Sequence, residues 1–433
     1  MGGGDEGSST SQGRDVRLRQ RSMIHRGTGF CALLVFTPLV LSAEPQWLTD
    51  ARAREGQLGE PRDIQSSDGW FSAKLPVAVI GKIEKVQGSY TVEFSVGSAN
   101  TASCEVFPDA VDPAAFLKTA AEKTFSDVIE KAQGKVDRRA LEAIDSGQFG
   151  VTPYLGLSWL YRVNVGKAPL LGALKQYTAV KQGHGIYCAH IDVGYVRTFQ
   201  SVVKALVESS IFHDKEPVAA PFYYETSVAQ LKGMKIGYST VTLERDADGD
   251  VKTIERTAVI IPVTPDTASY IDTLHLEWTH ADGAMINALL VVSLNDSLDS
   301  NLTLDAKQGR WHVTGEFKGK KIDQLIDAAG PPGTWLSRAL QRRALLNAEP
   351  SASQEAPSSA WVSADPTHFT ESRTTLLGKT PEGGQASLRE SVGGLVADVT
   401  VDAATGQELK ALVPIGNQTI TMERIGTQGS YWR

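Results

Sequence analysis

Three side chains that can bind a metal ion alternate along one short segment, at His184, Cys188 and His190. In an extended strand, residues separated by an even number of positions share a face, so these three would lie in one row. Imidazole and thiolate are ligands of zinc and copper. Adjacent residues on one face of a strand are about 6.6 Å apart, so a further group from elsewhere would have to complete the site. His184 and His190 are therefore candidates for a metal-assisted hydrolase, and a strand without metal is the simpler interpretation.

A possible acid and base pair lies further along the chain. His275 and Glu277 share the polar face of an alternating segment, where they would be placed to transfer protons. Neither a G-x-S-x-G nor an H-E-x-x-H motif accompanies them, and the two common glycine-rich phosphate loops are missing. The motifs favour a protein that is not an enzyme, and they predict no metal or other cofactor.

The cysteines carry a second prediction. Cys31 lies in an apolar stretch near the N-terminus, which leaves Cys104 and Cys188 as a pair if that stretch is removed. In an oxidising compartment such a pair commonly forms a disulfide. The bond would close a loop of about 85 residues and contribute on the order of 4 kcal/mol in the loop-entropy model. We predict a Cys104–Cys188 disulfide, with two free buried cysteines as the alternative.

The apolar stretch itself, Phe30 to Leu41, follows several arginines and is followed by the small residue Ala43. A basic segment, a short apolar segment and a small residue form a secretory signal peptide. Twelve residues rise only about 18 Å as a helix, which is short of a membrane span. We predict a signal peptide over residues 1–43, with Met1 or Met23 as the start, and a periplasmic or secreted protein. An uncleaved anchor or a buried helix is the alternative.

Charge and length limit the possible partners. Residues 1–43 contain five arginines and three acidic residues, so their removal would change the net charge from −7 to −9. An acidic protein disfavours nucleic acid and anionic membranes as partners. No later segment approaches 18 consecutive apolar residues, so we expect no stable transmembrane segment after cleavage.

The first half predicts strands and two helices. Residues 44–69 are polar and are expected to form a leader, and residues 70–213 an α+β domain in which helices cover an antiparallel sheet. Asp112 and Pro113 are typical of a helix start, and apolar residues follow at helical spacing. A second amphipathic helix is expected over Tyr195 to Val207.

The second half is almost wholly strands and turns. We expect an antiparallel β-meander or partial barrel over residues 217–346, a disordered insert over 347–360, and C-terminal strands over 361–433 that complete the β domain. One segment alternates clearly, with Leu274, Leu276 and Trp278 on the same side. These three residues are expected to line the inner face and to form a possible ligand face.

Two resemblances accompany these patterns. The segments Tyr223 to Glu225 and Lys232 to Tyr238 resemble the opening hairpin of the β domain that precedes the transglutaminase-like core of some bacterial exported proteins. Val399 to Asp402, Gly406 to Lys410 and Met422 to Arg424 are similar to the end of that domain. No cysteine occurs in the second half, so the core is absent and the resemblance implies at most an accessory role. The first half is similar to the PsbP-like fold in its order of elements only.

These observations predict an exported cell-envelope protein with a non-catalytic binding or scaffold role. Its partner would be an apolar ligand or an unknown envelope protein. The alternative is a metal-assisted hydrolase that uses His184 and His190. The sequence names neither the ligand, the oligomeric state nor the pathway.

Overall fold

The computed structural model describes residues 45–96, 100–132, 135–165, 168–214, 220–328, 330–349, 354–380 and 382–431. The predicted signal peptide therefore lies outside the described residues. The described residues form one compact unit.

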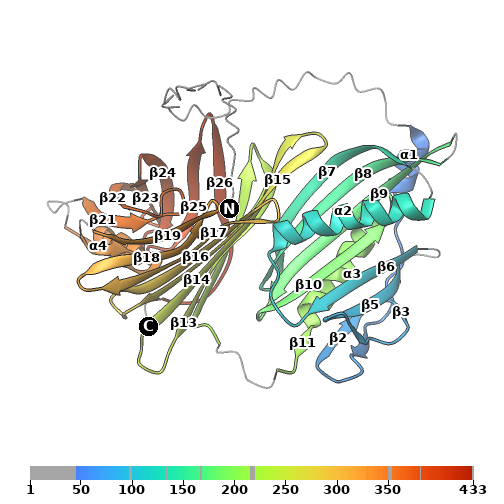
Figure 1. The fold of residues 1–433 in the computed structure, drawn as a ribbon, viewed down its shortest axis with the longest axis horizontal. Helices are drawn as coiled ribbons and strands as arrows, with labels where there is room; N and C mark the ends of the chain where they lie inside the picture. The colour runs from blue at the N-terminus through green and yellow to red at the C-terminus, as the bar shows by residue number, and fades with distance from the viewer. Residues whose placement is uncertain are drawn as a thin grey trace, which may run out of the picture. The chain divides into compact units, whose positions relative to one another are not determined.

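Eight strands of the first half form one antiparallel sheet, here called the first sheet. They are β3 (Val79–Ile80), β4 (Lys85–Val86), β5 (Ser89–Val96), β6 (Asn100–Phe107), β7 (Lys135–Phe149), β8 (Thr152–Val165), β9 (Ala168–Lys181) and β10 (His184–Ile191). Their order is β3-β5-β6-β10-β9-β8-β7, with β4 paired to β5 (Figure 1). A small sheet of order β1-β2-β11 lies beside it and consists of β1 (Arg62–Gln65), β2 (Phe71–Leu75) and β11 (Ile211–Phe212).

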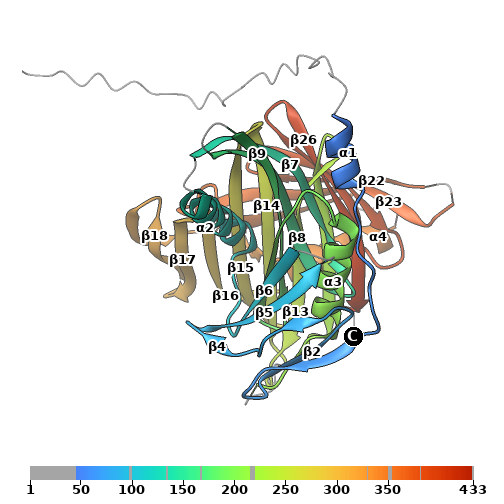
Figure 2. The same ribbon diagram turned by 90° about the vertical axis from the view of Figure 1, so that its right-hand side faces the viewer.

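Two helices pack on opposite faces of the first sheet, because alternate side chains of each strand point to opposite sides. Helix α3 (Val196–Ser209) buries Phe199 and Leu206 against the face that carries Tyr177. Helix α2 (Pro113–Ala132) buries Leu117 and Phe125 against the other face. Figure 2 shows the two helices on either side of β8. The predicted starts of both helices agree with the structure to within one residue.

The disulfide between Cys104 and Cys188 is confirmed. Cys188 of β10 lies directly opposite Cys104 of β6 in the antiparallel register, and both side chains are fully buried beneath α3. Directly opposite side chains of an antiparallel pair are close neighbours. Strand pairing therefore brings together two sulfurs that are 84 residues apart in the sequence.

The second half forms one sheet of fifteen strands within the described ranges, here called the second sheet. Its strands are β12 (Tyr223–Leu231), β13 (Met234–Arg245), β14 (Val251–Thr264), β15 (Thr267–Thr279), β16 (Met285–Leu294), β17 (Ser297–Lys307), β18 (Arg310–Phe317), β19 (Lys320–Ile326), β20 (Pro332–Gly333), β21 (Glu355–Trp361), β22 (Phe369–Lys379), β23 (Gln385–Val392), β24 (Leu395–Asp402), β25 (Glu408–Ile415) and β26 (Gln418–Gly429). Every neighbouring pair is antiparallel except β20 with β21.

The second sheet is a meander because its turns are tight. Lys232-Gly233, Gln308-Gly309 and Lys318-Gly319 each place two successive residues at positive φ, which is the geometry of a two-residue hairpin. The last strand, β26, pairs with β12, so the C-terminal strands and the earlier ones share one sheet.

The two ends of the second sheet approach each other, with helix α4 (Trp335–Asn347) against the inner face. Trp361 of β21 packs with Leu302 and Val313 of β17 and β18. The Gln324 side chain of β19 donates to the carbonyl of Thr367 at 2.9 Å. The sheet is therefore curled. Helix α4 contributes Leu336 and Leu346 to two hydrophobic clusters, each formed with a different group of strands.

The two halves also share a hydrophobic cluster. Tyr238, Ile260 and Tyr270 of β13 to β15 pack with Leu155 and Leu157 of β8. This cluster is continuous with the one beneath α2. The outer face of the second sheet therefore helps to cover the first sheet.

The predicted α+β fold class is wrong, because the protein is mainly β. The described residues contain twenty-six strands and only four helices, the fourth being α1 (Gln46–Arg52). Strands β7 to β9 are fourteen or fifteen residues long, and strands of both other sheets cover much of their surface. The sequence of β7 is rich in residues that also form helices, and its pairing with β8 overrides that preference.

Two segments expected to be irregular contain regular structure. The expected leader, residues 44–69, contains helix α1 and strand β1. The expected disordered insert, residues 347–360, overlaps β21 from Glu355 onward, where the chain pairs with β22. Both segments lack an apolar pattern, and their strands are stabilised by backbone hydrogen bonds to neighbouring strands. No helix among the described residues has the length and apolar character needed to cross a membrane.

Candidate functional site

Helix α2 is fixed most firmly at its N-terminal end. Asp272 of β15 accepts hydrogen bonds from the backbone N–H groups of Ala114 (3.0 Å) and Ala115 (2.7 Å). A carboxylate here satisfies unpaired amides and interacts favourably with the helix dipole. Burial nevertheless raises the pKa of Asp272 to about 6. Lys118 adds an ion pair with Asp296 at 2.8 Å, so the first two turns are attached to the second sheet.

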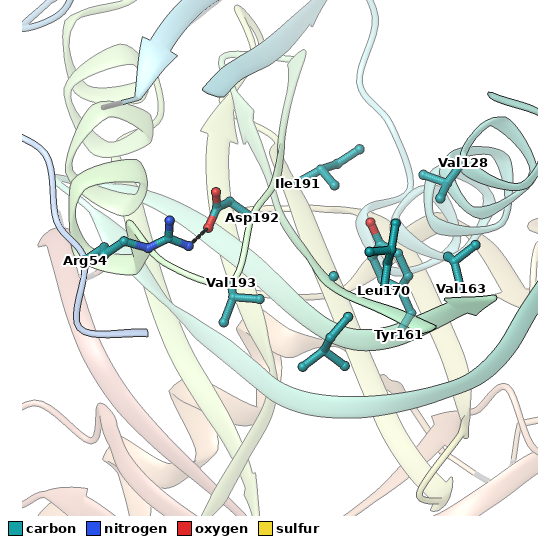
Figure 3. A pocket seen from close by; sticks show the side chains of 10 residues that line it. Arg54, Val128, Tyr161, Val163, Leu170, Ile191, Asp192 and Val193 are labelled. Atoms are coloured by element: carbon teal, nitrogen blue, oxygen red, sulfur yellow. Dashed lines mark hydrogen bonds and ion pairs between the residues drawn. The ribbon is translucent and has the colours of Figure 1, made fainter. Parts of the chain in front are cut away.

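The C-terminal half of α2 packs less closely and borders a pocket. Beyond Phe125, none of the α2 side chains that the structure describes is buried. The pocket has a volume of about 320 Å³ and is here called the α2 pocket. Its apolar wall consists of Val128, Tyr161, Val163, Leu170, Ile191 and Val193, which come from α2, three strands and the residues after β10 (Figure 3). Pockets for small ligands are typically apolar and begin at roughly this size.

The wall of the α2 pocket depends on one glycine. Tyr161 of β8 lies directly opposite Gly172 of β9, and its ring covers the glycine. A Cβ on Gly172 would lie 2.5 Å from Cζ of Tyr161, so a larger residue would displace the ring. The Phe125 ring contacts Tyr161 from α2, with the ring centroids 5.5 Å apart. The aromatic ring is therefore held between the glycine and the helix.

The rim of the α2 pocket combines an ion pair with exposed apolar side chains. Arg54 pairs with Asp192 at 3.1 Å, as Figure 3 shows. The carbonyl of Arg54 accepts a hydrogen bond from the N–H of Tyr195, which fixes the segment after α1 to the start of α3. Leu170 is 57% exposed and Ile191 is 45% exposed. The pocket therefore opens to solvent through an apolar rim, and its charged groups neutralise each other.

A second groove lies on the other side of Phe125. It has a volume of about 660 Å³ and is lined by Phe125, Val136, Arg138, Arg139, Pro265 and Asp266. Arg139 pairs with Glu122 at 3.0 Å and lies over the rings of Phe125 and Trp159, 5.8 Å from each centroid. Cation and carboxylate groups are balanced in this groove, so it has less of the apolar character of the α2 pocket.

The interior of the second sheet is occupied by α4 and a network of charged side chains. Arg342 of α4 contacts both oxygens of Glu390, at 2.6 and 2.9 Å, and Glu408 at 3.0 Å. Although burial opposes the charge, these carboxylates raise the pKa of Arg342 above its usual range. Nearby, burial raises the pKa of Glu225 to about 7, and the hydroxyl of Tyr223 donates to it. The charged network fills this part of the interior, and a separate groove of about 460 Å³ lies beside α4, lined by Pro331, Pro332, Leu340 and Ala344 among others.

His275 and Glu277 do lie in this interior, but not as a working acid and base pair. Their nearest side-chain atoms, Nδ1 and Oε1, are 3.8 Å apart. Burial lowers the pKa of His275 and raises that of Glu277, so it disfavours the charged form of each. Glu277 instead accepts the backbone N–H of Trp335 at 2.7 Å. Its role is to hold the N-terminus of α4.

The expectation that Leu274, Leu276 and Trp278 line the inner face is wrong. Side chains alternate along β15, and Glu277 faces α4, so its even-numbered neighbours face the opposite side. Asp272, on the same side as these three residues, contacts α2 of the first half. The alternation along β15 was predicted correctly. The polar side of the strand faces inward because Glu277 binds the N-terminus of α4.

His184 and His190 lie near opposite ends of β10, six residues or about 20 Å apart. His184 contacts the carbonyl of Pro108 (2.6 Å) and the carboxylate of Asp214 (2.8 Å). His190 is buried among aromatic rings, and burial lowers its pKa to about 4. Cys188 between them is in the disulfide. Within the described part of the chain, no three His, Cys, Asp or Glu residues are grouped to hold a metal ion.

The sequence interpretation missed the α2 pocket. Its wall combines residues from four separate segments, and no local motif connects them. One signal was present: Tyr161 and Gly172 are an aromatic residue and a glycine on strands joined by a short connection, and aromatic rings often cover glycine on a neighbouring strand. Without the register of β8 and β9, however, the sequence does not pair them.

Comparisons with known proteins give only weak structural likenesses. No family model matches the chain, and no curated protein matches it. A crystal structure of a β-barrel-like protein of domain of unknown function DUF1849 from Brucella abortus has a TM-score of 0.37 and 8% identity, covering 49% of this chain and 99% of that chain. The solution structure of cyanobacterial PsbP from Synechocystis has a TM-score of 0.24 and 16% identity, covering 36% and 98%. A DUF1089 family protein from Pseudomonas aeruginosa has a TM-score of 0.23 and 16% identity, covering 46% and 94%.

These likenesses bear on the two resemblances drawn from the sequence. Cyanobacterial PsbP, to whose fold the order of elements in the first half was compared, is one of these weak structural neighbours. The resemblance to the β domain before transglutaminase-like cores is not shown. At these TM-scores the neighbours carry no argument about function.

Proposed function

We propose that this chain is a non-catalytic binding protein of the cell envelope and that it holds an apolar ligand in the α2 pocket. The observation that carries the proposal is the apolar wall of this pocket, with an open rim where Leu170 is 57% exposed. Removing apolar surface from water is the main driving force for binding a ligand that lacks charge. A rim of exposed leucine and isoleucine offers that surface to a ligand entering from solvent.

The envelope location rests on two features. The apolar stretch Phe30 to Leu41 has the pattern of a signal peptide. The bond between Cys104 and Cys188 supports the same location, because disulfides persist in oxidising compartments and are rare in the cytosol. Detection of the mature chain in a periplasmic or secreted fraction, with both cysteines oxidised, is the expected result.

The alternative of a metal-assisted hydrolase receives no support from the positions of its candidate residues. His184 is engaged with Pro108 and Asp214, and His190 is enclosed at the other end of the same strand. A metal-activated water needs several ligands on one ion and an open coordination position. The two imidazoles are too far apart to share an ion.

The proposed function is tested by binding of a hydrocarbon probe to the purified full chain. Diphenylhexatriene fluoresces in apolar surroundings, and we expect saturable binding at one site. Leu170→Asp places a carboxylate at the pocket rim and should weaken binding roughly tenfold, equivalent to about 1.4 kcal/mol. Leu298→Asp is the matched control, because Leu298 is 53% exposed on β17 and does not line the pocket.

Two results would contradict the proposal. One is the absence of saturable probe binding together with the absence of any apolar compound in a solvent extract of the protein. The other is equal binding by the two aspartate variants, which would place the probe elsewhere on the molecule.

A further inference from the structure

Three polar atoms beneath α2 are buried without a hydrogen-bond partner. They are Nε1 of Trp159, Oε1 of Gln176 and Oγ1 of Thr178. Their residues are 3%, 0% and 1% exposed, respectively. Buried polar groups in proteins nearly always have a partner, either in the protein or in a bound molecule. Three such atoms on one face of a sheet therefore mark a place where a hydrogen-bonding group is expected.

The three residues are neighbours on the face of the first sheet that α2 covers. Gln176 and Thr178 alternate on β9 and so point to the same side. Trp159 of β8 lies opposite Leu174, which makes Gln176 its diagonal neighbour, and such neighbours are within reach of long side chains. The amide nitrogen of Gln176 already donates to the hydroxyl of Tyr187 at 2.7 Å. Its oxygen is the atom that remains available.

This polar cluster lies further along the same strands than the α2 pocket, and its three residues do not line that pocket. The pair Tyr161 and Gly172 borders the pocket, and the next pair on the same face is Trp159 with Leu174. The Phe125 ring contacts both aromatic residues, with centroids 5.5 Å from Tyr161 and 6.2 Å from Trp159. Counted from the pair Tyr161 and Gly172, Trp159 is one residue pair away on this face, Gln176 two pairs and Thr178 three pairs.

The chemistry of the cluster selects an uncharged partner. An indole N–H donates, an amide oxygen accepts, and a hydroxyl does either, which together match a hydroxyl, ester or amide group. Glu105 faces Tyr187 across the strands, and a carboxylate here disfavours a second negative charge. Arg139 lies over the Trp159 ring but is paired with Glu122. The three cluster atoms carry no charge themselves, and an anion would meet the Glu105 carboxylate while Arg139 is already paired.

We propose that the ligand of the α2 pocket is an uncharged amphiphile, such as an acylated glycerol or a fatty amide. Its chain occupies the α2 pocket, and its polar group is hydrogen-bonded beneath α2 by Trp159, Gln176 and Thr178. This inference rests on the proposed function and adds the class of ligand. The cluster lies beneath the part of α2 up to Phe125, because Phe116 in the first turn contacts Tyr187, which is opposite Thr178, and Phe125 contacts Trp159.

The test compares three probes on the purified full chain: 1-monopalmitoylglycerol, palmitate and diphenylhexatriene. The neutral ester should bind roughly tenfold more tightly than palmitate, although the chains are the same length. Thr178→Val removes the hydroxyl but keeps the shape of the side chain. It should weaken the binding of monopalmitoylglycerol roughly fivefold without changing the binding of diphenylhexatriene. Thr253→Val is the matched control, because Thr253 is also 1% exposed with an unpartnered Oγ1 but lies in the second sheet.

The outcomes separate the two proposals. If diphenylhexatriene binds, but palmitate binds as tightly as the neutral ester and Thr178→Val changes neither, an internal water fills the cluster and this inference is overturned. If no probe binds at all, the proposed function fails first. Trp159→Phe provides a second variant should Thr178→Val fold poorly, with circular dichroism as the check. A selective loss of the neutral ester in either variant supports the inference.

Discussion

Helices α2 and α4 both lie against a sheet, but the protein holds them in different ways. Helix α4 is fastened along its length: Glu277 accepts its first N–H, Arg342 binds two glutamates in its middle, and Lys379 donates to the carbonyl of Leu346 at its end. Helix α2 is fastened in its first half, by Asp272 and by the ion pairs of Lys118 with Asp296 and of Glu122 with Arg139. Its second half borders the α2 pocket, and three polar atoms without partners lie beneath the residues up to Phe125.

This difference indicates which region is structural and which is available for binding. Around α4, the carboxylates of Glu277, Glu390 and Glu408 have partners and hold the helix, although Oε1 of Gln341 and Nε2 of His275 have none. Beneath α2, both apolar surface and hydrogen-bonding groups remain unused. Regions with few buried contacts have low local stability, and ligand sites are commonly drawn from them. Four predictions test the comparison, from the largest expected effect to the smallest.

The largest effect is expected at Arg342. Arg342→Met leaves the buried carboxylates of Glu390 and Glu408 without their cation, and breaking such a pair costs about 3 to 5 kcal/mol. Urea unfolding should show this loss, while diphenylhexatriene binding by the folded variant stays unchanged. The matched control is Arg389→Met, which removes an exposed pair with Asp398 at 3.0 Å and should cost less than about 1 kcal/mol. Equal losses in the two variants would contradict a structural role for α4.

The second effect concerns the attachment of α2 and depends on pH. The folded pKa of Asp272 is about 6, above the ordinary value of 3.8, so the folded state retains a proton that the unfolded state releases. The contribution of this group to stability therefore falls as the pH rises from 4 to 6. Asp272→Asn loses an acceptor for the α2 amides at every pH but does not titrate. The free energy of unfolding of this variant is expected to lie below that of the wild type, and the difference should narrow by roughly 2 kcal/mol between pH 4 and pH 7.

The measurement is the free energy of unfolding of both proteins across that pH range. Asp296→Asn is the control, because Asp296 also contacts α2, through Lys118, but is largely exposed to solvent. No narrowing is expected for this variant. A constant deficit for Asp272→Asn would show that burial does not control this carboxyl.

The third effect links packing to the pocket. Gly172→Ala places a Cβ 2.5 Å from the Tyr161 ring and forces the ring to move. Overpacking of this kind costs about 1 to 3 kcal/mol, and the displaced ring should fill part of the α2 pocket. We expect a loss of roughly 1.5 kcal/mol in urea unfolding and weaker diphenylhexatriene binding. Gly378→Ala is the control, because no atom lies within 4 Å of its Cβ position, and it should change neither stability nor probe binding. Normal diphenylhexatriene binding by Gly172→Ala would argue against Tyr161 as part of the pocket wall.

The sequence predicts local features of this fold better than their arrangement. The disulfide, both helix starts in the first half and the antiparallel strands of the second half follow from residue types and periodicity. The predicted fold class is wrong because the described residues contain twenty-six strands and only four helices; β7, for example, is rich in helix-forming residues but pairs as a strand with β8. Alternation also located Leu274, Leu276 and Trp278 on one face, but only the position of α4 decides which face is inside.

The candidate site could not be predicted from the sequence for a related reason. Val128, Tyr161, Leu170 and Ile191 belong to different elements, and each looks like an ordinary core or surface residue in isolation. Their meeting depends on the register of three strands and on the position of α2. The orphan atoms of Gln176 and Thr178 are equally invisible, because a polar residue in an alternating strand normally predicts a solvent-facing side.

The smallest effect tests the other end of the comparison, at the N-cap of α4. The Thr334 hydroxyl accepts the N–H of Ser337 at 3.0 Å, and the Ser337 hydroxyl accepts the N–H of Thr334 at 2.7 Å, which completes a capping box. Thr334→Ala should cost about 1 kcal/mol of stability. Hydrogen exchange should then accelerate in α4 but not in α2, since the two helices have no cap in common. Ser210→Ala, in the residue after α3, serves as the control for loss of a buried hydroxyl, because its hydrogen bond to Leu206 lies far from α4 in the sequence and on another helix. If α2 exchanged faster together with α4 in Thr334→Ala, the two helices would open as one unit, and the distinction between a fastened and an available helix would not hold.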